Sequence, residues 1–216
     1  MKESTSKTVE EYIRSHPQIK SCLKGDLINL SSLARQITEE LKLTNKTSFD
    51  ATLIAIRRFN EKLSKEKVND KKIGDLLRKS SLEIKSKISI FTLQKATPLD
   101  RIDKLQEVLR KENCTFYVLE GSDNYTLIMD DRFASEAETK LVHYIIKLHR
   151  GLSMLNIKSP KDIQQIPGVL AYLTNIFSEN GINIMEFMSC WTDTLFIIDS
   201  KDLGKAITLF DKPLLE

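Results

Sequence analysis

The spacing of apolar residues along the chain changes near residue 83. Before that point, apolar side chains recur every three or four positions, which is the period of one face of an α-helix. After it, short apolar runs that fit β-strands alternate with stretches of helical period. The pattern therefore predicts an α+β protein with a helical N-terminal region and a β-containing C-terminal region.

The helical region, residues 1–63, is predicted to form a three-helix, helix-turn-helix-like domain. Its opening helix is either continuous or broken near His16-Pro17, because proline lacks the amide hydrogen that a helix interior uses. Asn29 can cap the second helix, and a polar turn at 44–47 precedes the third. The apolar faces of the three helices consist of Val9, Tyr12 and Ile13; Leu33, Ala34, Ile37 and Leu41; and Phe49, Leu53, Ile56 and Phe59.

Residues 64–82 form the most highly charged section and are expected to be a linker that contains a short amphipathic helix. Beyond it, the element order β-α-β-β-α is expected twice, once in residues 83–150 and once in residues 151–216. In the first copy, the second helix is expected to run from Ala134 to about Ile145. This order predicts an internal repeat of two ferredoxin-like units with the pattern βαββαβ.

The turn between the first strand and the first helix differs between the two copies. The second copy has Pro167-Gly168-Val169 where the first has Thr97-Pro98-Leu99, so only the second carries a glycine. Unpaired amides at a helix N-terminus suit a carboxylate, and glycine leaves room for a ligand to approach them. The alternative is an ordinary strand-to-helix turn without a ligand. The first copy is expected to be a scaffold.

The segment from Ile166-Pro167-Gly168-Val169 through Asn180-Gly181-Ile182-Asn183-Ile184 to Thr192-Asp193-Thr194-Leu195-Phe196-Ile197 resembles an ACT domain. The similarity is to the regulatory ACT domains of aspartokinases and covers about residues 151–210. It implies a sensor of a small molecule, usually an amino acid, bound where this turn meets a neighbouring ACT unit. One departure is the end of the chain, where the usual last strand is short, missing or supplied by another segment.

The resemblance also implies which residues would bind the effector. The family's glycine falls on Gly168 and its asparagine after the helix falls on Asn183. Backbone groups hold most of the ligand in that family, so the adjoining residues of the turn are included. The resulting candidates are Pro167, Gly168, Val169, Asn183, Ser189 and Thr192.

Charge is unevenly distributed along the chain. Residues 1–82 hold 17 Lys and Arg against 11 Asp and Glu, a net charge of +6, whereas the whole chain carries +3. A basic helical domain favours a polyanionic partner such as DNA, and the candidate contacts are Lys46, Thr47, Arg57, Arg58 and Lys62. The alternative is a helical module that contacts another protein.

No combination of residues indicates catalysis or a metal site. The histidines are scattered, and there is no Ser-His-Asp order, phosphate loop or metal-spaced Cys/His set. We therefore expect no catalytic residues, no metal and no cofactor other than the effector. An enzyme of unrecognised type is the remaining alternative.

Three isolated cysteines are typical of a reducing compartment, and no stretch reaches the roughly 20 apolar residues of a membrane span. The first residues lack the apolar core of a signal peptide, so a cytoplasmic location without membrane contact is expected. We also expect a homodimer, because the apolar strand at 184–188 would otherwise leave an exposed edge.

Taken together, these features predict an amino-acid-sensing regulatory protein in which the ACT unit controls a DNA-binding helical domain. The alternative is a stand-alone regulatory subunit that binds an amino-acid biosynthetic enzyme and has no contact with DNA.

Overall fold

The computed structural model describes the main chain of residues 4–43, 46–63 and 67–215. It divides into two compact units, Met1–Lys72 and Ile73–Glu216. Each unit has its own hydrophobic core, and we describe them separately.

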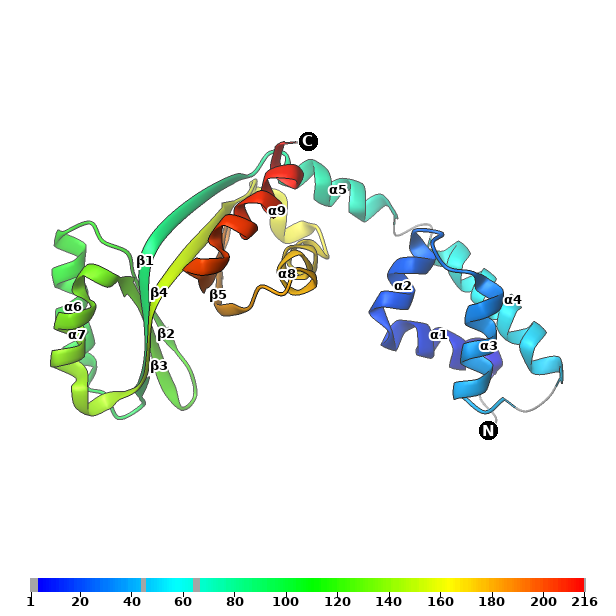
Figure 1. Cartoon of the computed structure of the whole chain (residues 1–216), viewed down its shortest axis with the longest axis horizontal. Coiled ribbons are helices and arrows are strands. Elements are labelled where there is room, and N and C mark those ends of the chain that lie inside the picture. Colours follow the sequence, from blue (N-terminus) through cyan, green and yellow to red (C-terminus); the bar gives the residue numbers. More distant parts are fainter. Residues whose placement is uncertain (1–3, 44–45, 64–66, 216) are drawn as a thin grey trace. The chain divides into compact units, whose positions relative to one another are not determined.

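The first unit is helical (Figure 1). Its described residues contain α1 (Thr5–Ser15), α2 (Pro17–Lys24), α3 (Leu30–Glu40) and α4 (Lys46–Leu63). The opening helix is broken at His16-Pro17, one of the two alternatives left open by the sequence, and Pro17 begins a new helix whose first turn needs no proline amide. The Asn29 side chain caps α3 by accepting hydrogen bonds from the amides of Ser31 and Ser32, as the sequence predicted. α4 packs against α1 and α3.

The second unit is an α+β fold built on one six-stranded antiparallel sheet with the order β2-β3-β1-β4-β6-β5. Its strands are β1 (Ser81–Gln94), β2 (Phe116–Glu120), β3 (Asn124–Asp130), β4 (Ile145–Lys158), β5 (Ile184–Cys190) and β6 (Asp193–Asp199). Its α-helices are α6 (Leu99–Lys111), α7 (Ala134–Leu141), α8 (Val169–Glu179) and α9 (Leu203–Leu215). The linker helix α5 (Lys67–Leu77) begins in the first unit and ends in the second.

Two long strands, β1 and β4, are shared by both halves of this sheet. They pair along their whole length, from Ser81 opposite Lys158 to Leu93 opposite Ile145. The second half of β1 also pairs with β3, and the second half of β4 pairs with β6. Each half of the sheet therefore has four strands in the order of a βαββαβ unit.

This arrangement shows where the last strand of the second repeat comes from. Residues 81–86, the first half of β1, lie beside β4 on the side opposite β6. The strand is thus supplied by another segment, one of the three possibilities left open by the sequence. In the same way, the first half of β4 supplies the last strand of the first repeat, beside the second half of β1. The start of β4 at Ile145 corrects the prediction that the preceding helix reaches Ile145, since α7 ends at Leu141.

Matching side-chain contacts confirm the internal repeat. Asp130 is the last residue of β3, and its carboxylate accepts a hydrogen bond from the amide two residues later. Asp199, the last residue of β6, does the same. The buried Ser89 of β1 donates to Asp131, and the buried Ser153 of β4 hydrogen-bonds to Ser200 at 2.7 Å. The two halves therefore have the same local structure despite different side chains.

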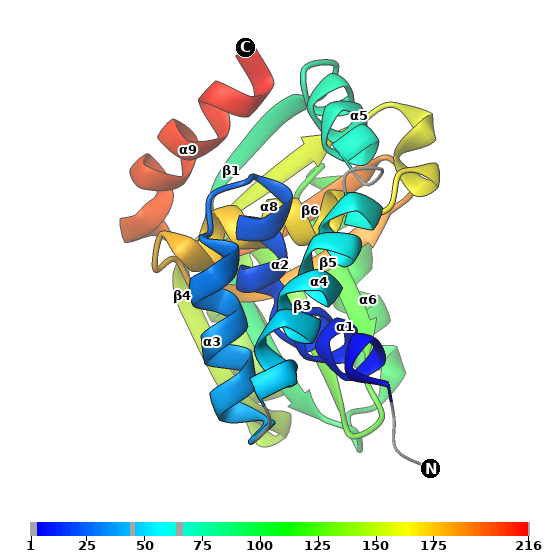
Figure 2. The ribbon, with the colours of Figure 1, turned by 90° about the vertical axis from the view of Figure 1, so that its right-hand side faces the viewer.

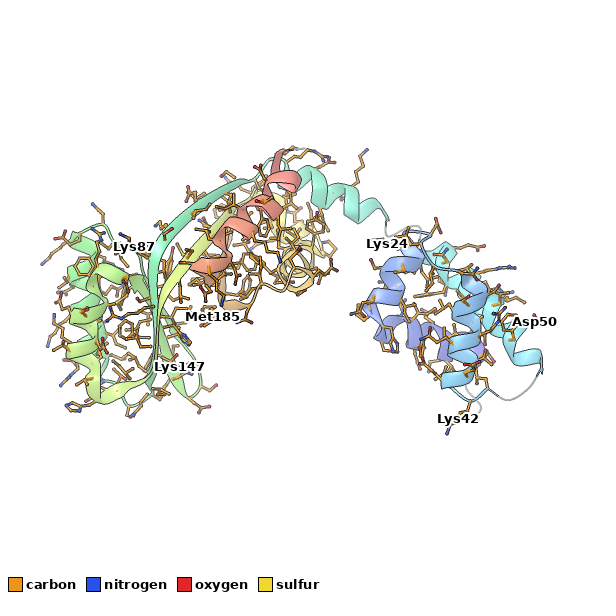
Figure 3. The ribbon with its side chains drawn as sticks, viewed as in Figure 1. Lys24, Lys42, Asp50, Lys87, Lys147 and Met185 are labelled. Atoms are coloured by element: carbon orange, nitrogen blue, oxygen red, sulfur yellow. The ribbon has the colours of Figure 1, made fainter. Side chains whose placement is uncertain are left out.

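Alternate residues along the strands form two kinds of core. One set of residues packs under the helices: Phe91, Leu93, Leu127 and Met129 under α6 and α7, and Leu155, Ile157, Phe196 and Ile198 under α5, α8 and α9. The intervening residues, including Ile90, Met154 and Ile197, form a third cluster on the face of the sheet that carries no helix. Side chains thus pack on both faces of the sheet (Figure 3).

The two long strands are irregular at the same point of the repeat. Lys87 is the seventh residue of β1 and has φ 58°, while Gly151 is the seventh residue of β4 and has φ 71°. The pairing register shifts beside them. Positive φ is readily adopted by glycine but costs an L-residue about 1–2 kcal/mol. Lys87 therefore carries local strain that Gly151 does not.

Replacing Lys87 by glycine is expected to raise the free energy of unfolding by about 0.5–1 kcal/mol, because relief of the positive φ exceeds the entropic cost of glycine. Lys147 is the control, since it is an exposed lysine of β4 without positive φ (Figure 3). Lys147→Gly should lower the free energy of unfolding. Urea denaturation measures both, and a loss of equal size in the two variants would contradict the assignment of strain to Lys87.

Candidate functional site

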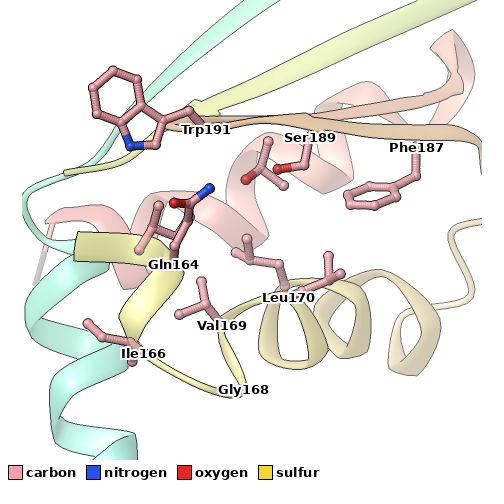
Figure 4. Close-up of a pocket in the computed structure, with 11 residues that line it drawn as sticks. Gln164, Ile166, Gly168, Val169, Leu170, Phe187, Ser189 and Trp191 are labelled. Atoms are coloured by element: carbon pink, nitrogen blue, oxygen red, sulfur yellow. The ribbon is translucent and has the colours of Figure 1, made fainter. Parts of the chain in front are cut away.

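A cavity of about 230 Å³ lies between the turn that leads into α8 and strands β5 and β6 (Figure 4). The turn and helix contribute Ile163, Gln164, Ile166, Gly168, Val169, Leu170 and Leu173. Phe187, Ser189 and Thr194 come from the two strands, and Trp191 from the turn that joins them. The site thus combines the second repeat's glycine turn with its β-hairpin.

Gly168 has a conformation that explains its identity. It is the N-cap of α8 and has φ 97°, in the left-handed region that L-residues adopt only with strain. A Cβ built on it would lie 3.4 Å from the Cδ1 of Ile73. Glycine is therefore required here mainly because of the positive φ, and less because a side chain would lack space. Figures 1 and 2 show the end of α5, which carries Ile73, beside this loop.

The N-terminus of α8 opens at this turn. Its first helical hydrogen bond runs from the amide of Tyr172 to the carbonyl oxygen of Gly168. The amides of residues 169–171 come before that bond and have no acceptor within the helix. Such amides and the positive end of the helix dipole attract a carboxylate.

The polar side chains at the cavity are uncharged. Gln164 extends between the turn and β5, opposite Ser189 and Trp191 (Figure 4). Ser189 and Thr194 are cross-strand partners, and the indole of Trp191 is exposed. None of the described lining residues has an ionisable side chain, so a charged ligand group would have to be met by backbone dipoles and neutral hydrogen bonds.

Three of the six candidate effector contacts line this cavity together: Gly168, Val169 and Ser189. Pro167 adjoins it in the chain. Asn183 is exposed beyond the other end of α8, where its amide donates to the sulfur of Met185 at 3.3 Å, and Thr192 hydrogen-bonds to Asp193 at 3.5 Å. Neither belongs to the cavity lining, so their proposed contacts do not follow from this geometry.

The cavity is also lined by three polar or aromatic residues that were not predicted from the sequence: Gln164, Trp191 and Thr194. Gln164 lies in a short 3₁₀ helix, Lys161–Gln165, that has no counterpart in the first repeat. Thr194 could have been found from the hairpin register, because it directly opposes Ser189. No local pattern identifies Trp191.

In the first repeat, a side chain of the corresponding turn hydrogen-bonds within the turn. Thr97 is buried and donates from its hydroxyl to the carbonyl oxygen of Gln94 at 2.6 Å. Pro98 serves as the N-cap of α6 with φ −62°, an ordinary conformation. The first repeat therefore has no glycine with positive φ at this turn.

The candidate DNA contacts divide into three groups. Arg57 and Arg58 are exposed on α4, and no ion pair of theirs occurs within the described residues. Lys62 forms an ion pair with Glu10 at 3.3 Å, and hydrogen bonds from Arg14 and Lys62 lower the pKa of that carboxyl. The side chains of Lys46 and Thr47 lie outside the described residues. Thr52 of the same helix is buried, and its hydroxyl accepts a hydrogen bond from that of Thr38 at 3.5 Å.

Within the described residues, no helix combines the length and the apolar composition that crossing a membrane requires. The same residues contain no cluster of three His, Cys, Asp or Glu side chains placed to hold a metal ion.

Comparison with known proteins shows what this fold is similar to. Residues 147–212 match the family model of the ACT domain. No curated protein sequence matches the chain. Among solved structures, the aspartate kinase of Clostridium acetobutylicum aligns with a TM-score of 0.51 and 12% identity, covering 62% of this chain and 34% of that one.

Two further structures have the same fold. Aspartokinase III of E. coli, in complex with aspartate and ADP, aligns with a TM-score of 0.50 and 12% identity over 63% of this chain and 33% of that one. A chain from a structure of aspartokinase alpha and beta subunits aligns with a TM-score of 0.51 and 10% identity, over 65% of this chain and 98% of that one. The chain thus spans about a third of the length of the two kinases.

Proposed function

We propose, on the premise that this chain contains an ACT domain at residues 147–212, that it is a regulatory protein that binds an amino-acid effector beside Gly168. The observation that carries the proposal is the cavity formed by the left-handed Gly168, the open N-terminus of α8 and the β5–β6 hairpin. The protein itself performs no catalysis and transmits effector binding to a partner.

The chemistry of the cavity suggests how the effector is held. Its carboxylate lies against the free amides of residues 169–171. Its ammonium group donates to neutral oxygens such as the hydroxyls of Ser189 and Thr194 and the side-chain carbonyl of Gln164. Because most of the lining is apolar and none of its described members is charged, the geometry favours an amino acid with an uncharged side chain.

The linker helix provides a route from the effector to the helical unit. Ile73 of α5 is packed in the same core as Val169 and Leu173 of α8, next to Gly168. Leu76 and Leu77 fix the end of α5 in that core as well. Any rearrangement of the turn on binding therefore acts on a helix that begins in the other unit.

A thermal-shift screen of the twenty common amino acids tests this proposal. A ligand at about 100 times its Kd stabilises the folded state by about 2.7 kcal/mol, so an effector should raise the melting temperature by several degrees. We expect at least one amino acid with an uncharged side chain to do so. If all twenty leave the melting temperature unchanged, the effector proposal is wrong.

For the partner, we propose an enzyme of amino-acid biosynthesis, regulated in the manner of an aspartokinase. The support is the alignment with a chain from aspartokinase alpha and beta subunits, 98% of which is covered. On this proposal the helical unit makes the contact with the enzyme. Co-purification with candidate enzymes, with and without the effector, is the corresponding experiment, and no retention of any enzyme would count against it.

A second candidate partner is DNA, favoured by Arg57 and Arg58, which are exposed without an ion pair in the described part of the unit. If these arginines neutralise phosphates, the affinity for duplex DNA must fall with salt by a log–log slope of about −0.9 per phosphate contact. The double variant Arg57→Ala, Arg58→Ala should then flatten that slope by about two units.

Lys62→Ala serves as the control in this titration, because Lys62 is already paired with Glu10 and its loss should change the slope less. An unchanged slope in the double arginine variant, or binding weaker than the roughly 10⁻⁴ M of the weakest non-specific binders, would leave the enzyme partner as the remaining candidate.

A further inference from the structure

A second cavity, of about 410 Å³, lies on the face of the sheet that carries no helix. Unlike the cavity at Gly168, its lining is rich in ionisable groups. These are Glu83 and Lys85 of β1, Tyr117 of β2, Lys158 of β4, Cys190 of β5 and Asp193 of β6. Met154, Asn156 and Leu195 complete the lining and come from the same face as the third hydrophobic cluster.

The curvature of the sheet creates this cavity. β2 and β5 are the two outer strands of the six-stranded sheet, yet Tyr117 and Cys190 line the same space. The sheet therefore curls so that its first-repeat edge approaches the hairpin of the second repeat. A molecule bound here would contact both repeats at once.

Three of the charged groups already have partners. Lys158 forms an ion pair with Glu83 at 2.8 Å across β4 and β1. Asp193 accepts a hydrogen bond from the Nδ2 of Asn156 at 2.7 Å. These pairs hold the side chains in place and leave the net charge of the set near zero.

Three other polar groups have hydrogen-bonding capacity that no described partner uses. Lys85 forms no described ion pair and donates only to the hydroxyl of Thr115, at 3.1 Å. The hydroxyl of Tyr117 has no described partner, and burial followed by the nearby Asp193 raises its pKa, so it remains a donor. The Oδ1 of Asn156 is the one buried side-chain N or O atom without a partner among the described residues.

A buried acceptor without a donor costs about 1–3 kcal/mol, so native proteins retain few of them without a reason. These three groups are a cation, a hydroxyl donor and a carbonyl acceptor, and the carboxylate of Asp193 lies against the amide nitrogen of the same Asn156 side chain. A carboxylate suits the first two groups, and an ammonium group suits the other two.

We propose that this cavity is a second binding site for a small zwitterion, namely the ammonium and carboxylate groups of an α-amino acid. Lys85 and Tyr117 hold the carboxylate, and Asn156 and Asp193 hold the ammonium. Tyr117 belongs to the first repeat and the other three to strands of the second repeat's half of the sheet, so the ligand bridges the repeats.

Titration of ¹⁵N-labelled full-length protein with glycine, the smallest such zwitterion, tests the proposal. Glycine should shift the amide signals of Lys85, Tyr117, Asn156 and Asp193 in one saturable process. Acetate and methylammonium, which each carry half of the ligand, should bind at least about tenfold more weakly. Gly168→Val should leave this titration unchanged, which separates it from the effector site beside α8.

Variants with matched controls identify the contacts. Lys85→Met and Tyr117→Phe should each weaken glycine binding about tenfold or more, whereas Lys147→Met and Tyr144→Phe should have no effect. Asn156→Leu should abolish binding while keeping or raising the melting temperature, since it removes an unsatisfied buried oxygen.

Three results would overturn the proposal. They are unchanged amide signals around the cavity at high glycine concentration, wild-type affinity in Lys85→Met, and a lowered melting temperature with retained binding in Asn156→Leu. The last would identify Asn156 as a purely structural residue.

Discussion

Gly168→Val is expected to abolish effector binding at the α8 cavity. The variant places a β-branched residue at φ 97°, which costs about 1–3 kcal/mol and is relieved only if the turn changes conformation. Either outcome displaces the amides that begin α8, because Gly168 is its N-cap. Calorimetric titration with the amino acid that gives the thermal shift should show no binding to the variant.

Gly181 provides the matched control for this experiment. It follows the other end of the same helix, has φ 68° and has no atom within 4 Å of a built Cβ. Gly181→Val should therefore lower the free energy of unfolding by a similar amount, about 1–3 kcal/mol, without loss of the effector. Equal affinity in wild type and Gly168→Val would place the effector site elsewhere.

Phe177→Ala is expected to have the largest effect on stability, a loss of about 3–5 kcal/mol in the free energy of unfolding. Phe177 of α8 is fully buried, and its ring lies 4.8 Å from that of Phe196 and 5.0 Å from that of Phe210, between centroids. Removing it leaves a cavity among the helices and strands of the second repeat. Urea denaturation monitored by circular dichroism measures the loss.

Leu170→Ala is the control on the same helix, because that side chain is 46% exposed. Its cost should stay below about 1 kcal/mol. If Phe177→Ala cost no more than Leu170→Ala, the core described between α8, β6 and α9 would be incorrect.

The features that the sequence predicted best are those set by one residue or by a short period. The cap at Asn29 depends on local backbone chemistry, which a single side chain reveals. The repeated element order followed from the alternation of strand-like and helical periods. Each of these properties is contained within about ten residues of sequence.

The borrowed strand could not be predicted because its partner is far away in the sequence. Residues 81–86 read Ser-Leu-Glu-Ile-Lys-Ser, which resembles the charged linker before it. Their strand structure depends on pairing with β4, some 70 residues later. Likewise, the start of β4 at Ile145 was assigned to a helix, since tertiary pairing overrides local preference.

The candidate site was predicted in part for the same reason. Gly168 and Val169 follow from the turn, whereas Thr194 and Trp191 reach the cavity only through the β5–β6 hairpin. Asn183 was assigned by resemblance alone, and the position of β5 leaves it outside the lining. Side chains that meet only because two strands pair in a particular register cannot be predicted until that register is known.

The most direct test of the central claim is a crystal structure of the protein with the amino acid that raises its melting temperature. The account predicts density for the ligand between Gly168 and Trp191, with its carboxylate against the amides of residues 169–171. Density for that amino acid only at another position, with this cavity unchanged, would contradict it.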